Sequence, residues 1–131
     1  LTSIRDIGRV SVVDFAQMDS LAQLHMVCKH RLMVGVHGQG MEWGHALNAG
    51  DPRGSGMIEF RFGSWPCYYA GRMLKSGMKS QCQEHAPAGS SKVAKHDDVI
   101  VNVTLLRRQS VTLVRQLSGG SWSARHIRAS K

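Results

Sequence analysis

The sequence is short of cysteine, metal-binding motifs and long apolar runs, and each shortage excludes a class of protein. Its 131 residues contain three cysteines, none of them in a CxxC pair, so a structural zinc site is not expected. The seven histidines include no HExxH motif and no pair four residues apart, which argues against metal binding. No apolar run approaches the roughly 18 to 20 residues that cross a bilayer, so we expect a soluble segment without a membrane span.

Acidic residues are also scarce, with 9 Asp and Glu against 17 Lys and Arg, a formal charge of +8. Such a charge fits a polyanionic partner such as RNA, but the basic residues are scattered, so a merely solvated basic surface is the other interpretation. The length allows one domain at most. The chain starts at Leu1 without an initiator methionine, signal peptide or transit segment, which is compatible with a piece of a larger protein.

The odd number of cysteines permits one disulfide. Cys67 and Cys82 are the favoured pair because both border expected loops, whereas Cys28 is expected to be a thiol in the core.

Apolar periodicity predicts strands alternating with helices. The expected strands are 9–15, a run around Val34, and 57–62; the expected helices are 20–28, 41–49 and 67–75. This order is typical of an α/β fold, a Rossmann-like parallel sheet with helices on its faces.

The rest of the chain divides by composition. Residues 1–79 form the expected Rossmann-like core, and 80–96 read as a polar surface loop. Residues 97–117 are expected to form an amphipathic helix capped by Asp97 and Asp98, although the β-branched residues 99–101 also allow a strand there. The basic tail 118–131 lacks periodicity and is expected to be mobile.

The apolar run Leu32-Met33-Val34-Gly35-Val36 ends abruptly in His37-Gly38-Gln39-Gly40. Gly38 and Gly40 lack a Cβ, so the backbone between them can take positive φ and bring its N–H groups close to a phosphate or sugar oxygen. His37 would lie at the carboxyl end of the strand, where ligands collect in open α/β sheets. A histidine whose hydrogen bonds are satisfied by the backbone of a tight turn is the alternative.

Several elements in order resemble the carboxyl-terminal part of the family sixty-one glycosyltransferases. They are Ala22-Gln23-Leu24 in a helix, the apolar strand running into His37-Gly38-Gln39-Gly40, the strand Met57-Ile58-Glu59-Phe60, the pair Cys67-Tyr68, and a terminal helix at 99–117. The resemblance implies a GT-B architecture in the secretory pathway lumen. It also implies transfer of a sugar from a UDP-sugar donor to a protein or glycan hydroxyl, with no other cofactor. Donor binding then falls to His37, Gly38, Gln39, Gly40 and Glu59.

The sequence also departs from this family pattern. The family usually has alanine at the position of Gln39, and Leu followed by Thr or Ser at Met41-Glu42. A carboxylate at Glu42 would repel the diphosphate that the turn should bind. An alternative is therefore a noncatalytic basic module, a degenerate glycosyltransferase domain that serves in a larger protein assembly or beside RNA.

Other candidates have two interpretations each. Glu59 can accept hydrogen bonds from a ribose or a uracil edge, or it can pair with Arg61 or cap a backbone N–H. Arg53, Arg61 and Arg72 can clamp phosphate or be solvated surface charges.

The sequon at Asn102 would be glycosylated only if exposed in a secretory lumen. No general base can be assigned, so the isolated chain is expected to be inactive.

Overall fold

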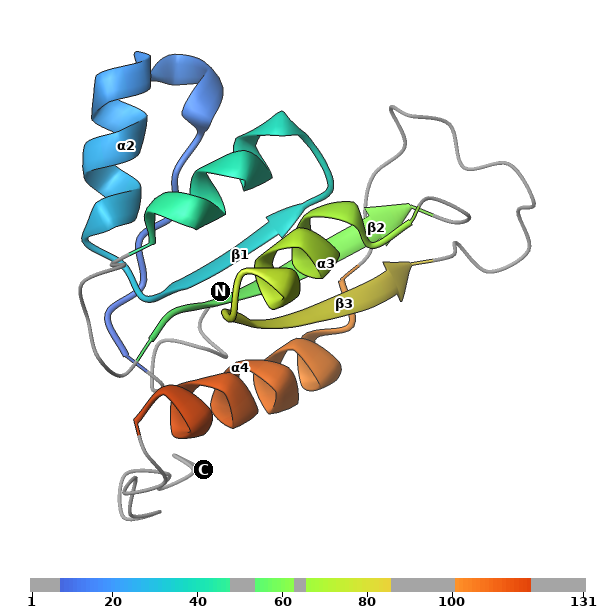
Figure 1. Cartoon of the computed structure of the whole chain (residues 1–131). Helices are drawn as coiled ribbons and strands as arrows, with labels where there is room; N and C mark the ends of the chain where they lie inside the picture. Colours follow the sequence, from blue (N-terminus) through green and yellow to red (C-terminus); the bar gives the residue numbers. More distant parts are fainter. Residues whose placement is uncertain (1–7, 48–53, 63–65, 86–100, 119–131) are drawn as a thin grey trace, which may run out of the picture.

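The computed structural model describes residues 8–47, 54–62, 66–85 and 101–118 (Figure 1). It contains a small parallel sheet of three strands with flanking helices, an α/β fold. The strands are β1 (Leu32–Val36), β2 (Gly56–Phe62) and β3 (Lys79–His85), and they pair in the order β1-β2-β3. The helices are α2 (Ser20–Cys28), α3 (Tyr68–Lys75) and α4 (Val103–Leu117), with 3-10 helices η1 (Phe15–Gln17) and η2 (Gln39–Ala46).

The central strand β2 supplies the core on both faces of the sheet. Met57 belongs to a cluster of buried residues with Met41 of η2 and with Tyr69 and Met73 of α3. Ile58 and Phe60 point the other way, because successive side chains alternate along a strand, and they pack against Leu113 of α4. Figure 1 accordingly shows α3 and α4 on opposite faces of the sheet.

Local hydrogen bonds explain where the helices begin and end. Asp19 accepts the N–H of Ala22 at 2.8 Å and starts α2 at the predicted residue. Helix α3 stops at Gly77, whose φ of 81° is the left-handed conformation that glycine tolerates best. The bond from Met78 N to Met73 O, 3.0 Å, completes a Schellman motif, so the glycine signal at this helix end was read correctly.

The first predicted strand, 9–15, is wrong. Residues 8–14 form no regular element, and a 3-10 turn starts at Phe15, because the Asp14 side chain accepts the N–H of Ala16 at 3.0 Å. Such a local bond competes with pairing in a sheet. The segment is instead tethered beside β1 through Ser11, whose hydroxyl lies 3.0 Å from Nε2 of His30.

The polar loop predicted for 80–96 is wrong over its first six residues, which belong to β3. This strand pairs with β2 along its whole length, and one of its polar side chains, Gln83, is buried beneath α4 beside Gln109. Tertiary pairing has overridden a polar local sequence. Residues 86–96 lie outside the described part of the chain.

Three smaller predictions also change. The helix expected at 41–49 is the 3-10 helix η2, which begins at Gln39 and ends at Ala46. Helix α4 begins at Val103, and its N-cap is Asn102, which accepts the N–H of Leu105 at 2.9 Å. The caps expected at 97 and 98, the alternative strand 99–101 for the most part, and the tail from 119 fall outside the described residues. Cys28 is exposed at the end of α2 and is not the expected core thiol.

Candidate functional site

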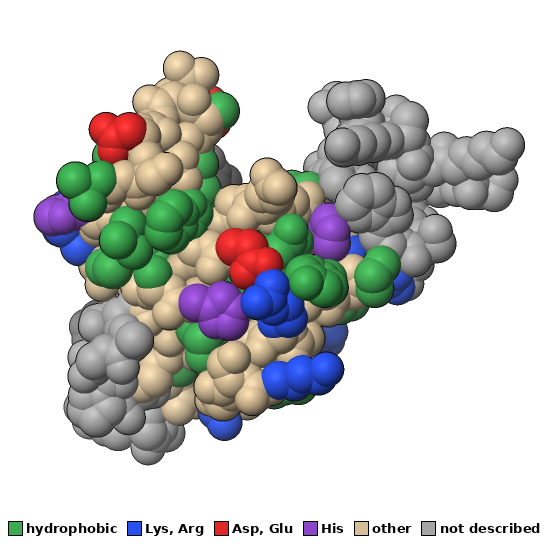
Figure 2. All heavy atoms as spheres, turned by 45° about the horizontal axis from the view of Figure 1, so that its top comes forward, with side chains coloured by type: hydrophobic (Ala, Val, Ile, Leu, Met, Phe, Trp, Pro, Cys, Tyr) green, Lys and Arg blue, Asp and Glu red, His purple; other side chains and the backbone are tan. Residues whose placement is uncertain are grey.

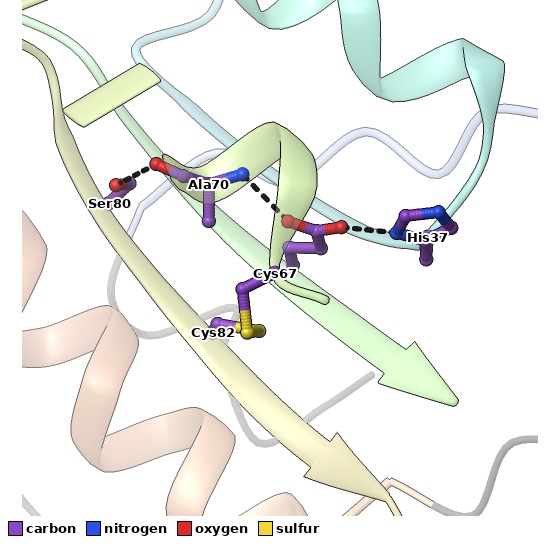
Figure 3. Close-up of a disulfide and its surroundings, with 6 residues drawn as sticks. His37, Cys67, Ala70, Ser80 and Cys82 are labelled. Atoms are coloured by element: carbon purple, nitrogen blue, oxygen red, sulfur yellow. Dashed lines mark hydrogen bonds and ion pairs between the residues drawn. A yellow bond between two sulfur atoms is a disulfide. The ribbon is translucent and has the colours of Figure 1, made fainter. Parts of the chain in front are cut away.

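His37, at the carboxyl end of β1, meets Glu59, which lies midway along the neighbouring parallel strand β2. The register pairs Gly35 with Glu59 and Val36 with Phe60, and the N–H of His37 continues the ladder to Phe60 O at 2.7 Å. This register places the side chain of His37, which directly follows β1, beside the carboxylate of Glu59 in β2. Nδ1 of His37 lies 2.6 Å from Oε1 of Glu59 (Figure 3).

The Glu59 carboxylate is wholly buried, and both of its oxygens have partners. Oε2 accepts the N–H of Ala70 at 2.7 Å, in the first turn of α3. The first N–H groups of a helix have no partner within the helix and favour a negative charge, so this is a suitable place for a buried carboxylate. Of the predicted alternatives, Glu59 caps a backbone N–H, but its side-chain partner is His37 and not Arg61.

The contact with Glu59 determines how the His37 ring is used. An ionised carboxylate can only accept hydrogen bonds, so Nδ1 of His37 carries the hydrogen. Nε2 is then the basic nitrogen of the neutral ring, and it becomes a second donor when the ring is protonated. The His37 side chain is 10% exposed, so solvent reaches it only at its edge.

Tyr69 forms the third side of this site. Its ring is buried and lies 5.0 Å from the His37 ring, measured between centroids. Burial raises the pKa of the Tyr69 hydroxyl above its ordinary value, and the negative charges of Glu42 and Glu59 raise that pKa further. The Tyr69 hydroxyl therefore stays protonated throughout the physiological pH range.

An exposed ion pair lies beside the buried group. Arg72 of α3 donates to Oε1 of Glu42 in η2, and His45 Nε2 lies 3.9 Å from the other oxygen of that carboxylate. Figure 2 shows acidic, basic and histidine side chains side by side on this face. Because Glu42 and Arg72 are each more than 40% exposed, water screens their attraction, and the pair adds little stability. It does counter the negative charge of Glu42.

The turn 37–40 is built differently from the prediction. Gly38 has a φ of 166°, which is extended backbone, and among the described glycines only Gly54 and Gly77 have positive φ. A Cβ on Gly40 would lie 3.0 Å from the ring of Phe15, so this glycine makes room for η1. The expected reason for the two glycines, a left-handed turn open to a ligand, is therefore wrong. Gln39 is exposed and begins η2.

A cavity of about 250 Å³ lies beside the turn. Its walls come from the segment around Phe15, from α2 and from β1, and they include Gly38 and Gly40 but neither His37 nor Glu59. No local sequence pattern indicates this cavity, because its walls come from separate segments of the chain.

The remaining predictions concern residues that take no part in the contact between His37 and Glu59. The favoured disulfide is present, between Cys67 just before α3 and Cys82 in β3. Asn102 caps α4, and Arg53 lies outside the described residues. Sequence reasoning did not assign Tyr69 and Ala70 to the site. The only sequence feature that points to these two residues is the predicted start of a helix shortly after the strand that contains Glu59.

Within the described ranges, no three His, Cys, Asp or Glu side chains are grouped so that they could hold a metal ion. No helix in these ranges combines the length and apolar character needed to cross a membrane. Comparison with known proteins identifies no relative, since no protein-family model, curated protein or solved structure matches the chain. The site therefore has to be interpreted from its own chemistry.

Proposed function

We propose that this chain is a nucleotide-sugar-binding domain of a GT-B glycosyltransferase similar to family sixty-one. The full-length enzyme would transfer a sugar from a UDP-sugar to a protein or glycan hydroxyl. The observation that carries the proposal is the contact between His37, directly after β1, and Glu59 in the middle of β2. The contact lies at the carboxyl end of β1, and in open α/β sheets ligands bind beyond the carboxyl ends of the strands.

The chemistry of the pair suits a diphosphate. Glu59 holds the imidazole through Nδ1, and Nε2 can donate a charge-assisted hydrogen bond to a phosphate oxygen when the ring carries its second proton. During transfer, the acceptor oxygen bonds to the anomeric carbon, and the bond from that carbon to the diphosphate breaks. Negative charge develops on the departing diphosphate, where a preoriented donor is most effective. His37 would supply that donor, and Glu59 would hold it in place.

The ion pair of Glu42 with Arg72 weakens the objection that Glu42 would repel the diphosphate. The charge of the Glu42 carboxylate is opposed by the Arg72 guanidinium in direct contact with it. The disulfide between Cys67 and Cys82 is in keeping with an oxidising compartment such as the secretory pathway lumen.

Calorimetry with UDP and UDP-N-acetylglucosamine tests the proposal. We expect saturable binding to the wild-type chain. His37→Ala should weaken it by about 10- to 100-fold, since a hydrogen bond to a charged group contributes about 1.5–3 kcal/mol. His25→Ala is the matched control, because His25 is exposed on α2 and far in sequence from the strand ends. Binding equal in the wild type and in His37→Ala would refute the assignment of His37.

The same preparation tests the alternative, a basic interaction module. If neither nucleotide binds while RNA is retained in a salt-sensitive way, the alternative is supported. The chain alone should transfer no sugar, because no general base for the acceptor hydroxyl is assigned to it. Measurable transfer by residues 1–131 would contradict that expectation.

A further inference from the structure

The first turn of α3 connects the disulfide to the His37–Glu59 pair. Its Ala70 N–H donates to Glu59, and Glu59 in turn holds Nδ1 of His37. Any displacement of this turn therefore moves the donor that fixes one carboxylate oxygen. The orientation of His37 depends on α3 as well as on its own strand.

Helix α3 packs on the core through Tyr69, Ala70 and Met73, but it has no local hydrogen-bonding device that fixes its first turn. It is eight residues long, and a helix of that length is marginal in isolation. Its N-cap residue, Cys67, makes no side-chain capping hydrogen bond. The usual local device that fixes the start of a helix is thus missing here.

Strand β3 supplies the missing attachment in two ways, both visible in Figure 3. Cys82 forms the disulfide with Cys67, directly before the helix. Two residues earlier on the same strand, the Ser80 hydroxyl donates to the carbonyl oxygen of Ala70 at 2.5 Å. Cys82 is the register partner of Glu59, so the attachment lies level with the carboxylate that it helps to orient.

We propose that the Cys67–Cys82 disulfide and Ser80 are positioning elements of the site, which hold Ala70 against Glu59 and thereby fix His37 as the Nδ1–H tautomer. A dithiol opens the crosslink by exchange: two electrons pass from the dithiol to the cystine, the dithiol closes to a disulfide, and each cysteine gains a hydrogen. The first turn of α3 is then released from β3, and Glu59 loses one of its two donors. Nucleotide binding becomes sensitive to reduction, a consequence that rests on the proposed function.

The test is nitrogen-15 NMR of the histidine rings in the full chain. In the oxidised protein, we expect His37 to show a protonated Nδ1 whose hydrogen exchanges slowly. In Cys67→Ser/Cys82→Ser, and in the wild type after dithiol treatment, that signal should be lost, and His37 should shift toward the tautomer mixture of the exposed His25. Cys28→Ser is the matched control and should change nothing, because Cys28 is exposed and forms no disulfide.

The proposal is overturned if the double variant keeps its sheet and helices by circular dichroism and His37 keeps its protonated Nδ1. If the double variant does not fold, Ser80→Ala with the disulfide intact decides the question. It removes the hydroxyl that holds the Ala70 carbonyl, so the Nδ1 proton of His37 should exchange several-fold faster. An unchanged exchange rate in this variant overturns the proposal.

Titration of the same samples with UDP separates this inference from the proposed function. A changed His37 tautomer without UDP binding in any sample supports the positioning role and refutes nucleotide binding. Equal UDP binding before and after reduction, with an unchanged tautomer, refutes the positioning role and leaves the nucleotide site standing.

Discussion

Replacing Glu59 tests whether the buried contact is built as described. In Glu59→Gln, the amide oxygen can still accept the N–H of Ala70, but the amide NH2 then faces His37. Nδ1 of His37 has to give up its hydrogen and accept from this NH2, and the charge opposite His37 is lost. A hydrogen bond to a charged group contributes about 1.5–3 kcal/mol and a neutral one about 0.5–1.5 kcal/mol, so we expect the free energy of unfolding to fall by about 1 kcal/mol. The volume of the side chain is almost unchanged, so no cavity contributes.

In Glu59→Leu, both acceptor oxygens are removed, and two buried donors, the N–H of Ala70 and Nδ1–H of His37, lose their partner. Each unsatisfied buried group costs about 1–3 kcal/mol, which gives a loss of about 2–6 kcal/mol before the relief of burying a neutral residue is counted. Leucine should therefore destabilise the chain more than glutamine does.

Urea unfolding of the three proteins at neutral pH measures these differences. Glu42→Gln is the matched control, because that carboxylate is exposed, and its loss should cost less than about 1 kcal/mol. A Glu59→Leu protein as stable as the wild type would refute the reasoning, since it would mean that the two donors are satisfied without Glu59.

Three further predictions concern packing, titration and the crosslink. Gly44→Ala should destabilise the chain by about 1–3 kcal/mol, because a Cβ there would meet buried methionines. Gly71→Ala should stabilise α3 by about 0.5–1 kcal/mol, because the space around Gly71 is open. Thermal unfolding measures the Tm of both variants, and equal shifts in Tm would contradict this description of the packing. Because the Tyr69 pKa is raised, the unfolded chain ionises first as the pH rises above about 10, so stability falls there. A pH titration followed by phenolate absorbance measures this pKa. The part of the absorbance that is missing in Tyr69→Phe belongs to Tyr69, and its midpoint should lie above pH 10.0. The disulfide spans 15 residues, so the free energy of unfolding of Cys67→Ser/Cys82→Ser should be about 3 kcal/mol lower than that of the wild type. Coincident urea unfolding curves of the two proteins would argue against this stabilisation.

The elements that could be predicted from the sequence are those that carry their own local signal. The apolar strand at β1 and the helix α2 are examples, because both follow from the spacing of neighbouring apolar residues. Strand β3 carries no such signal. The disulfide at Cys82 is the predicted one, but the pairing with β2 that accommodates the polar residues of β3 does not follow from the local pattern.

The same distinction applies to the site. His37 could be placed at a strand end and Glu59 within a strand from the sequence, because His37 follows an apolar run and Glu59 lies within one. Their mutual contact could not, because it depends on the register that pairs Gly35 with Glu59. The role expected for Gly38 and Gly40 failed for a related reason, since what Gly40 accommodates is Phe15, a residue from a segment that was expected to be a strand.

The position of Glu59 argues that its carboxylate is kept for more than folding. Along β2 it follows Met57, and the buried side chains on that face include Met41, Met57 and Met73, so the surroundings are strongly apolar. Taking a charge out of water into such surroundings costs several kcal/mol, and replacing both members of a buried ion pair by apolar residues is often neutral or stabilising. Because apolar surroundings also strengthen a satisfied hydrogen bond, the pair that is present holds one histidine nitrogen rigidly at a strand end. A fixed imidazole in that place is what the proposed donor site requires.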